Sequence, residues 1–286
     1  MTTEGKTNRK RIALVIGAGS VKCAAALGLQ KVLAREGIDI SMVVGCSGGS
    51  IYAAMIAIGW DVQTATELTK KLWTRDITQK RNARALFSIV LPGLFGFNER
   101  FGALDDRRIL ETLKSTFGDK RIEQTKIPLY IAATDYMMGE QVIMSQGPLV
   151  DALRASIAIP FIFPAWPVGE RLLVDGGLSD PLPVGVAIKE GANLIIAMGF
   201  ESAYQTHINS LTRFSFQISS IMSNNLLKAN FAFHNLAHHA EVLPIIPEFK
   251  EHIKLFDTDK ISYIIEEGER AMEKQLAYVR RALEVS

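Results

Sequence analysis

The sequence predicts an α/β fold with a mostly parallel central sheet flanked by helices, and three observations support this. A near-continuous apolar run at 11–16 leads into a glycine-rich turn and a helix with an apolar face. A second apolar run at 40–44 leads into another apolar helix, and this alternation continues to residue 200. Because fully apolar strands are typical of sheets covered on both faces, helices are expected on both sides, in a three-layer sandwich.

Composition limits the classes of protein that remain. The chain has 286 residues, 48% hydrophobic and 22% charged, enough for one large α/β domain. A net charge of +2 gives no general case for nucleic-acid binding. Two cysteines, Cys23 and Cys46, are too few for a disulfide scaffold, which favours reduced thiols and a cytosolic-type environment.

We divide the chain into a basic N-terminal tail at 1–10, an α/β core at 11–200 that contains the candidate site, and a C-terminal helical part of the same domain at 201–286. The basic tail and the apolar run after it imitate a secretory signal, but glycines and Lys22 interrupt the apolar part. No apolar run reaches the ~18 residues of a membrane span. We therefore expect a cytoplasmic protein, with peripheral contact at the inner membrane surface left open.

The first strand and the turn after it, residues 17–23, admit two interpretations. A dinucleotide-binding fingerprint needs a third glycine where the chain has Lys22, and Asp39 precedes the second strand and so lies at the wrong edge of the sheet. The turn fits an oxyanion hole better, since backbone N–H groups there can face a developing negative charge. The expected donors are Gly17, Ala18, Gly19 and Ser20.

The second strand ends in a GxSxG pattern centred on Ser47. Such a pattern places the serine on a sharp strand-to-helix turn, with its hydroxyl exposed above the sheet. Gly45 and Gly49 lack Cβ atoms where strand and helix press together. The pattern therefore predicts a nucleophile elbow with Ser47 at a helix N-terminus, where the dipole favours negative charge.

Residues 80–104 combine basic side chains with an apolar segment. A lid or lipid-contacting segment and a helix packed into the core remain equal alternatives. The residues expected to contact substrate in the first case are Phe87, Leu91, Phe95 and Phe97.

Further elements continue the alternation. A helix is expected over 105–118, a strand at 127–135 with a turn role for Asp135, a helix at 183–192, and a strand at 193–200. Helices are also expected at 207–240 and 258–285, the first with a broad apolar face. Core packing is the plainer account of that face, and capping of the acyl pocket or a homodimer are the alternatives. The residues that form it are Phe214, Ile218, Ile221, Met222, Leu226 and Phe231.

A serine nucleophile needs a base. The histidines all lie at or beyond His207, and three of them fall in a polar helical stretch typical of a solvated face, with no third metal ligand close by. Asp175 ends an apolar strand and precedes Gly176 and Gly177, so its carboxylate would face the crevice at the carboxyl edge of the sheet. We therefore predict a Ser47/Asp175 dyad.

Five segments in this order resemble the patatin-like phospholipases, which include the catalytic domain of cytosolic phospholipase A2. They are GAGSVKC, GCSGGS, ATDYMMGEQVIMSQG, RASIAIPFIFPA and VDGGLSDPLP. The resemblance implies Ser47 as nucleophile, Asp175 as base without a histidine, the 17–20 turn as oxyanion hole, and no metal or other cofactor. Lys22 and Cys23 depart from the usual Arg-Gly, and Asp180 replaces a common asparagine, which puts the local hydrogen bonding in doubt.

The function predicted is serine acyl hydrolysis of fatty-acyl esters in phospholipids or lysophospholipids, through an acyl-enzyme. Acyl transfer to an alcohol is a related outcome. A non-catalytic lipid-binding module that retains the fold is the alternative from another class, and a nucleotide-binding protein is a more distant one. The expected partners are a lipid substrate, with peripheral membrane contact and a homodimer as open options, and no nucleic acid.

Overall fold

The computed structural model describes residues 10–73, 82, 98, 101–104, 106–201, 204, 207–209, 211–237, 240–253 and 257–284. Within 211–237 the side chains of 211, 212, 215, 216, 231 and 233–237 are also outside the description. The residues proposed for a lid, Phe87, Leu91, Phe95 and Phe97, lie outside the described residues.

The predicted fold class is confirmed. An eight-stranded sheet has the order β5-β6-β3-β2-β1-β7-β8, with β4 paired to β3 off this path. Strands β3, β2, β1, β7 and β8 are mutually parallel, whereas β4, β5 and β6 add antiparallel pairs at one side. The strands are β1 Ile12–Ile16, β2 Met42–Cys46, β3 Leu129–Asp135, β4 Gln141–Met144, β5 Trp166–Val168, β6 Arg171–Asp175, β7 Leu194–Met198 and β8 Glu241–Ile245.

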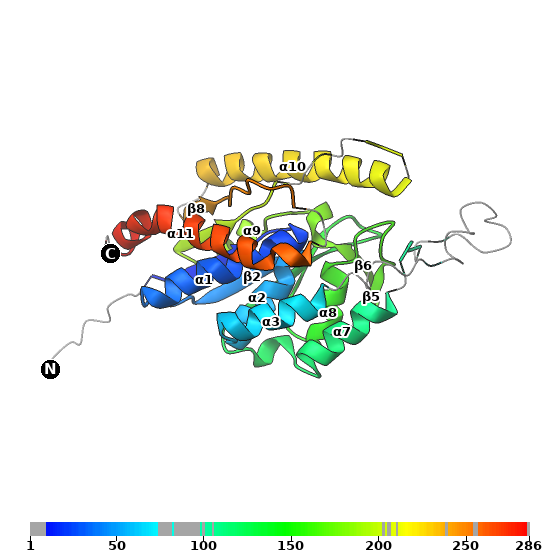
Figure 1. The fold of residues 1–286 in the computed structure, drawn as a ribbon, viewed down its shortest axis with the longest axis horizontal. Coiled ribbons are helices and arrows are strands. Elements are labelled where there is room, and N and C mark those ends of the chain that lie inside the picture. Colours follow the sequence, from blue (N-terminus) through cyan, green and yellow to red (C-terminus); the bar gives the residue numbers. More distant parts are fainter. Residues whose placement is uncertain are drawn as a thin grey trace.

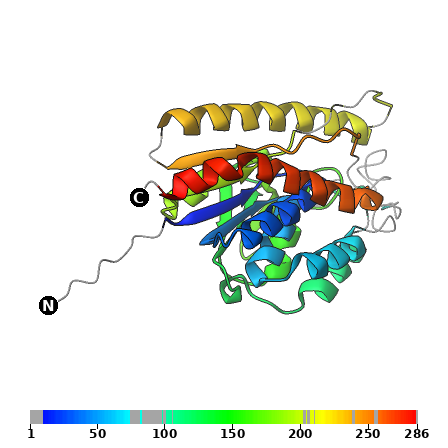
Figure 2. The same ribbon diagram turned by 60° about the vertical axis from the view of Figure 1, so that its left-hand side comes forward.

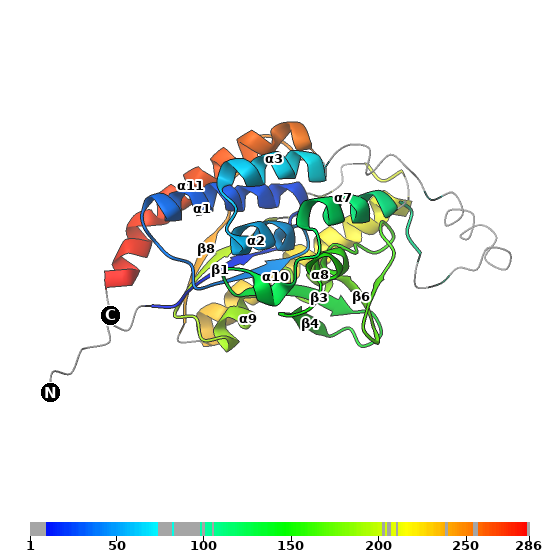
Figure 3. The same ribbon diagram turned by 90° about the horizontal axis from the view of Figure 1, so that it is seen from below.

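Helices cover both faces of the sheet, so the three layers are present (Figure 1). One face carries α1, α2, α3, α7, α8 and α11, and the other carries α9 and α10, as the view from below also shows (Figure 3). The helices are α1 Ala25–Arg35, α2 Gly48–Ile58, α3 Val62–Leu72, α7 Arg107–Phe117, α8 Leu149–Ser156, α9 Val184–Lys189, α10 Leu211–Ala237 and α11 Ile261–Glu284.

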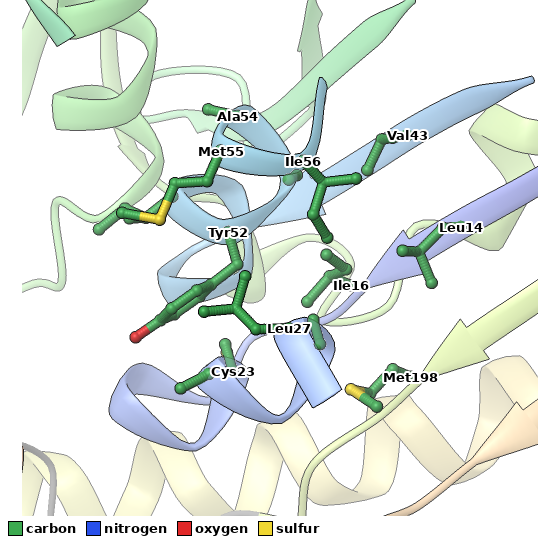
Figure 4. Close-up of a cluster of buried hydrophobic side chains, with 14 of the residues drawn as sticks. Leu14, Ile16, Cys23, Leu27, Val43, Tyr52, Ala54, Met55, Ile56 and Met198 are labelled. Atoms are coloured by element: carbon green, nitrogen blue, oxygen red, sulfur yellow. The ribbon is translucent and has the colours of Figure 1, made fainter. Parts of the chain in front are cut away.

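Strand β1 shows why the central strands form. All five of its residues are buried, and alternate side chains enter different clusters. Leu14 and Ile16 pack under α1 and α2 with Leu27, Ile56 and Met198 (Figure 4), while Ala13 and Val15 face α9. A strand that is apolar at every position can pack against the helices on both faces of the sheet, which explains why polar and apolar residues do not alternate in the sequence.

Beyond residue 200 the chain is not only helical, contrary to our expectation for 201–286. Strand β8 follows α10 and pairs in parallel with β7, with Glu241 opposite Leu194. Its short run EVLPI contains Pro244, which an edge strand tolerates because one row of N–H groups needs no partner. The C-terminal part therefore extends the same sheet. Within 207–240, where one or two helices had been expected, the structure has one long helix, α10.

Helices α1 and α11 approach each other backbone to backbone through two glycines. A Cβ atom on Gly28 would lie 1.9 Å from the carbonyl oxygen of Ile265, and one on Gly268 would lie 1.9 Å from the carbonyl oxygen of Ala25. Neither contact leaves room for a methyl group. The two glycines therefore set the distance between these helices and hold α11 against the first helix of the fold.

This contact yields a stability prediction. Replacing Gly28 by alanine should lower the free energy of unfolding by about 1–3 kcal/mol, because overpacking outweighs the ~1 kcal/mol that alanine gains in helix propensity. The measurement is urea unfolding followed by circular dichroism. Gly37→Asn is the control, since Gly37 has a φ of 66° and no atom within 4 Å of an added Cβ. Equal midpoints for Gly28→Ala and the parent would contradict the prediction.

Candidate active site

Ser47 lies on a strained turn between β2 and α2. Its φ of 53° and ψ of −130° are unusual for a residue with a side chain, and such conformations cost about 1–3 kcal/mol. The neighbouring glycines make the turn possible. A Cβ on Gly45 would lie 2.5 Å from Cα of Ser50, and one on Gly49 would lie 2.4 Å from the carbonyl oxygen of Ile16. This is the geometry of a nucleophile elbow.

The hydroxyl of Ser47 donates a hydrogen bond directly to Asp175, with Oγ and Oδ2 2.6 Å apart. No histidine stands between them, because the contact is direct. Both side chains are buried, so the pair is shielded from bulk water. The structure thus brings together two residues 128 positions apart in the chain.

Our reason for placing Asp175 beside Ser47 was wrong in one respect. We treated the strand before Asp175 as ending at the carboxyl edge of a parallel sheet, but β6 runs antiparallel to β3. The register brings the residues together instead. Asp175 pairs with Ala133, and the neighbouring Ala132 pairs with Cys46, so Asp175 and Ser47 lie at almost the same level of the sheet.

The second carboxylate oxygen of Asp175 is also occupied. Oδ1 accepts the N–H of Gly177 at 2.8 Å, and the Asp175 backbone is fixed by Ala158 and by the hydroxyl of Thr134. Burial raises the pKa of Asp175 to about 6, although its hydrogen bonds with Ser47 and Gly177 act in the opposite direction. A carboxylate with this pKa is a stronger base than an ordinary aspartate and is still ionised at neutral pH.

Ser156, at the end of α8, hydrogen-bonds to the turn that carries Ser47. Its Oγ accepts the backbone N–H of Ser47 at 2.9 Å and donates to the carbonyl oxygen of Ala132 at 2.7 Å. Sequence analysis did not single it out. It lies within RASIAIPFIFPA, but its contact partner is 109 positions away. Local patterns carry no information about such a contact.

The glycine-rich turn supplies fewer free donors than we expected. The N–H of Gly17 donates to the carbonyl oxygen of Met198 at 2.9 Å, and that of Ala18 donates to Pro181 at 2.8 Å. These two groups are therefore committed to holding the turn and cannot serve as oxyanion donors in this conformation. Among the described residues, no hydrogen bond uses the N–H of Gly19.

Gly48 brings the glycine-rich turn against the elbow. A Cβ on Gly48 would lie 2.8 Å from both N and Cα of Ser20, so the two backbones touch. Ser20 has a φ of 55°, a second strained position beside the first. Gly48 follows Ser47 at a helix N-terminus, where N–H groups lack intrahelical acceptors. Sequence analysis did not single out Gly48, although the elbow pattern carries the signal, because the residue after the serine of such a pattern commonly contributes to an oxyanion hole.

Lys22 occupies the position where Arg is usual in the resembled family. Its Nζ donates to the carbonyl oxygen of Glu201 at 2.6 Å, and burial lowers the pKa of this ammonium group. It also borders a groove of about 440 Å³ that includes Phe200 and the segment 246–253. That groove has several charged groups in its lining and is poorly suited to a fatty-acyl chain.

Both cysteines are free and buried, as expected for reduced thiols. Cys23 Sγ contacts the carbonyl oxygen of Gly17, and Cys46 Sγ contacts that of Asp180. Burial raises the pKa of each thiol, so neither is an activated nucleophile. They fill space beside the turn that carries Ser47.

Asp180 links the loop after Asp175 to α10. Its Oδ1 accepts from Asn230 Nδ2 at 2.7 Å and from the N–H of Leu182 at 3.0 Å, and its Oδ2 accepts from Gln141 at 3.3 Å. Burial raises the pKa of this carboxyl group. An aspartate therefore satisfies the hydrogen bonding that was in doubt when it replaced an asparagine.

The remaining candidates lie elsewhere or outside the description. Asp135 has the expected turn role, since its Oδ1 accepts the N–H groups of Met137 and Met138. His207 is exposed, and His252 lines the groove beside Lys22. Within the described part of the chain, no three His, Cys, Asp or Glu side chains gather as a metal site. The described helices include none long and apolar enough to cross a membrane.

Comparison with known proteins agrees with this geometry. The family model for patatin-like phospholipases matches residues 14–188, which include the glycine-rich turn, the elbow and Asp175. The chain belongs to the patatin-like phospholipase family. Among solved structures, that of VipD from Legionella pneumophila covers 94% of this patatin-like chain with a TM-score of 0.52 at 13% identity, a similarity of fold alone.

Several relatives belong to the group named after neuropathy target esterase. An NTE family protein of Mycobacterium tuberculosis is 33% identical over 193 residues, 68% of this chain and 50% of that protein. The neuropathy target esterase sws of Drosophila melanogaster is 29% identical over 201 residues, 70% of this chain and 13% of that protein. The patatin-like chain thus matches about half the length of the mycobacterial relative and a small part of the fly protein.

Ser156 yields a prediction about the elbow. Ser156→Ala leaves the buried N–H of Ser47 without its acceptor, so the free energy of unfolding should fall by about 1–3 kcal/mol. The elbow should also be less well fixed, and turnover of a soluble ester should fall. Urea unfolding and ester hydrolysis measure the two effects. Ser115→Ala, on an exposed surface, is the matched control, and equal behaviour of both variants would contradict the prediction.

Proposed function

We propose that the protein is a lipid acyl hydrolase that cleaves fatty-acyl esters of phospholipids or lysophospholipids through a Ser47/Asp175 dyad. The observation that carries the proposal is the direct 2.6 Å hydrogen bond between Ser47 Oγ and Asp175 Oδ2 at a nucleophile elbow. Membership of the patatin-like family supports the lipid ester as substrate class. The fly relative's name, an esterase, is consistent with ester hydrolysis.

In the acylation step, Asp175 Oδ2 accepts the proton of Ser47 as Oγ bonds to the ester carbonyl carbon. The tetrahedral intermediate then collapses, and the bond from the carbonyl carbon to the alcohol oxygen breaks. Asp175 returns its proton to the leaving alcohol. The products of this half-reaction are a free alcohol and Ser47 esterified by the fatty acid.

Deacylation repeats the same proton movements with water. Asp175 accepts a proton from the water whose oxygen attacks the acyl carbonyl carbon. The bond to Ser47 Oγ breaks, Oγ recovers the proton from Asp175, and the fatty acid leaves. One carboxylate thus acts as base and then as acid in each half of the cycle.

For the oxyanion, we propose the N–H groups of Gly19 and Gly48 as donors. Gly48 begins α2, so the helix dipole adds to its effect on a negative oxygen. Ser20 lies against Gly48 and fixes the approach of the two turns. Gly17 and Ala18 would contribute by holding the turn through Met198 and Pro181 rather than by direct contact.

Two alternatives remain distinct from this proposal. An acyltransferase would use the same acyl-enzyme but deliver the acyl group to an alcohol, which an added acceptor alcohol would reveal as a new ester product. A non-catalytic lipid-binding module would retain the fold without reacting at Ser47. The strained φ of Ser47 and the raised pKa of Asp175 favour an enzyme, because both cost stability without aiding lipid binding.

Active-site labelling tests the nucleophile. A fluorophosphonate probe should label the native protein, and Ser47→Ala should abolish the labelling. Asp175→Asn should keep the fold, because an amide oxygen can still accept from Gly177, but lower hydrolysis by about 10²–10⁴-fold. Mass spectrometry of the labelled peptide and ester hydrolysis measure these effects.

Labelling at a residue other than Ser47, or full activity in Asp175→Asn, would overturn the proposed dyad. Ser50→Ala is the matched control for the first variant, since Ser50 lies in the same turn but its Oγ donates to the carbonyl oxygen of Ser47. Incubation with a panel of phospholipids, lysophospholipids and neutral lipids, followed by analysis of released fatty acids, would define the substrate.

The pKa of Asp175 predicts a pH profile. Since Asp175 must be ionised to act as base, kcat/KM on a soluble ester should rise about tenfold per pH unit below about 6 and level off above it. The same shift affects stability. The folded state holds this proton to higher pH than the unfolded state, so Asp175 destabilises the fold increasingly as pH rises from about 4 to about 6.

Two measurements check this prediction, a pH–rate profile and urea unfolding at several pH values. In Asp175→Asn the unfolding free energy should lose this component of its pH dependence. A rate profile that bends near pH 4, the ordinary range of an aspartate, would show that burial does not raise the pKa of the catalytic base.

A further inference from the structure

The outer face of α10 carries an exposed apolar stripe. Four residues at helical spacing form it, with exposed fractions of 51% for Phe214, 43% for Ile218, 39% for Ile221 and 59% for Met222. Positions i, i+4, i+7 and i+8 share one side of a helix. We had favoured core packing for these residues, and the structure shows instead that they face outward.

The inner face of the same part of α10 is partly polar. Ser220 and Asn224 are 7% and 4% exposed, and further along the helix Leu227 joins the core cluster on the α9 face of the sheet. Asn230 binds Asp180 in the loop after Asp175. In this part of α10, two polar side chains therefore face inward while four large apolar side chains remain exposed, which burial of an apolar helix face would not produce.

The charged side chains of this region are all basic. Residues 202–240 contain no Asp or Glu, although the whole chain has 30. Lys228 is exposed and, at 100° per residue, lies on the same side of α10 as Ile221, two turns further along. Arg213, in the first turn, is on another side of the helix, and its guanidinium donates to the carbonyl oxygen of His207. The outer face thus combines the apolar stripe with Lys228 and no acidic group, a combination suited to a surface that is apolar inside and anionic at its boundary.

Topology places the stripe at the active-site end of the sheet. Because β8 starts at Glu241, soon after α10 ends, the C-terminus of α10 lies near the beginning of the parallel strands, and the helix runs back past them. Its 27 residues span about 40 Å, whereas a five-residue strand spans about 16 Å. Its N-terminal half therefore extends beyond the strand ends, on the side where Ser47 follows β2 (Figure 2).

We propose that the N-terminal half of α10 is a docking surface for a lipid bilayer with anionic headgroups. Phe214, Ile218, Ile221 and Met222 would enter the boundary between headgroups and acyl chains, and Lys228, just beyond this half on the same side of the helix, would contact phosphate groups. This rests on the proposed function, since docking at that end brings the elbow towards esters in the bilayer. The structure assigns this role to the helix without requiring any residue of the dyad.

A second copy of the chain fits the stripe less well. Four partly exposed side chains offer roughly half of the ~800 Å² per partner that a standard interface buries. In a two-fold pairing of the same faces, Lys228 would meet a helix that also lacks acidic groups. The missing countercharge makes a lipid surface the better partner.

The test compares vesicle binding by the full chain and a triple variant, Ile218→Ser/Ile221→Ser/Met222→Gln. The probe is sucrose-loaded vesicles of phosphatidylcholine with 30% phosphatidylglycerol, sedimented with the protein. We expect the variant to partition at least about tenfold less, because burial of apolar side chains drives insertion. Binding by the native chain should weaken with salt and with removal of the anionic lipid.

The control is Met137→Gln/Met138→Gln, which removes two equally large and even more exposed apolar side chains from the β3–β4 turn. It should bind vesicles as the native chain does. Native binding by the triple variant, or an equal loss in the turn variant, would overturn the assignment to α10. A change from dimer to monomer in the triple variant without a loss of vesicle binding would assign the stripe to a second copy and also overturn it.

Failure of docking and failure of the proposed function give different results. The triple variant should keep fluorophosphonate labelling and hydrolysis of p-nitrophenyl butyrate, a soluble ester, while its hydrolysis of vesicle lipid falls. Ser47→Ala should still bind vesicles. Vesicle binding without labelling would refute the enzyme and leave docking intact, whereas labelling without vesicle binding would refute docking alone.

Discussion

The close approach of backbones around Ser47 is the constraint on which the rest of the site depends. The elbow holds a non-glycine residue at positive φ, and it does so because three neighbouring positions lack Cβ atoms. The missing Cβ leaves room for α2 at Gly45, for the end of β1 at Gly49, and for the turn at Ser20 at Gly48. The same three close approaches bring Ser47 and the turn at Ser20 together, so the geometry of the proposed site follows from packing that the core itself requires.

Burial is the main cause of the raised pKa of Asp175. A carboxylate removed from water becomes more basic, and the remaining hydrogen bonds from Ser47 and Gly177 keep Asp175 ionisable at neutral pH. A histidine base is useful because its ordinary pKa lies near 6.5. Desolvation moves the pKa of Asp175 to about 6, so the proposed Ser47/Asp175 dyad would need no histidine. The cost is the stability lost by burying a charge.

Much of this arrangement is readable from the sequence because it is local. Apolar runs, the elbow glycines and the glycines after Asp175 predicted the parallel core and the pair of residues, Ser47 and Asp175, that the structure joins by a hydrogen bond. The antiparallel direction of β6 was not readable, since it depends on pairing with β3 across about 40 residues. The hydrogen bonds that occupy the N–H groups of Gly17 and Ala18 could not be predicted either, because their acceptors, Met198 and Pro181, lie in distant segments.

The orientation of helix α10 could not be predicted from its sequence. Periodicity identified an apolar face but not whether that face is buried or exposed, because the contacts of the opposite face with the rest of the protein decide this. Here Asn230 hydrogen-bonds to Asp180, five residues after Asp175, and Leu227 packs against the sheet. The helix is therefore fixed to the same loop as Asp175. A surface bound along its outer face would be held in one orientation to Ser47, so any substrate in that surface would reach the elbow from a constant direction.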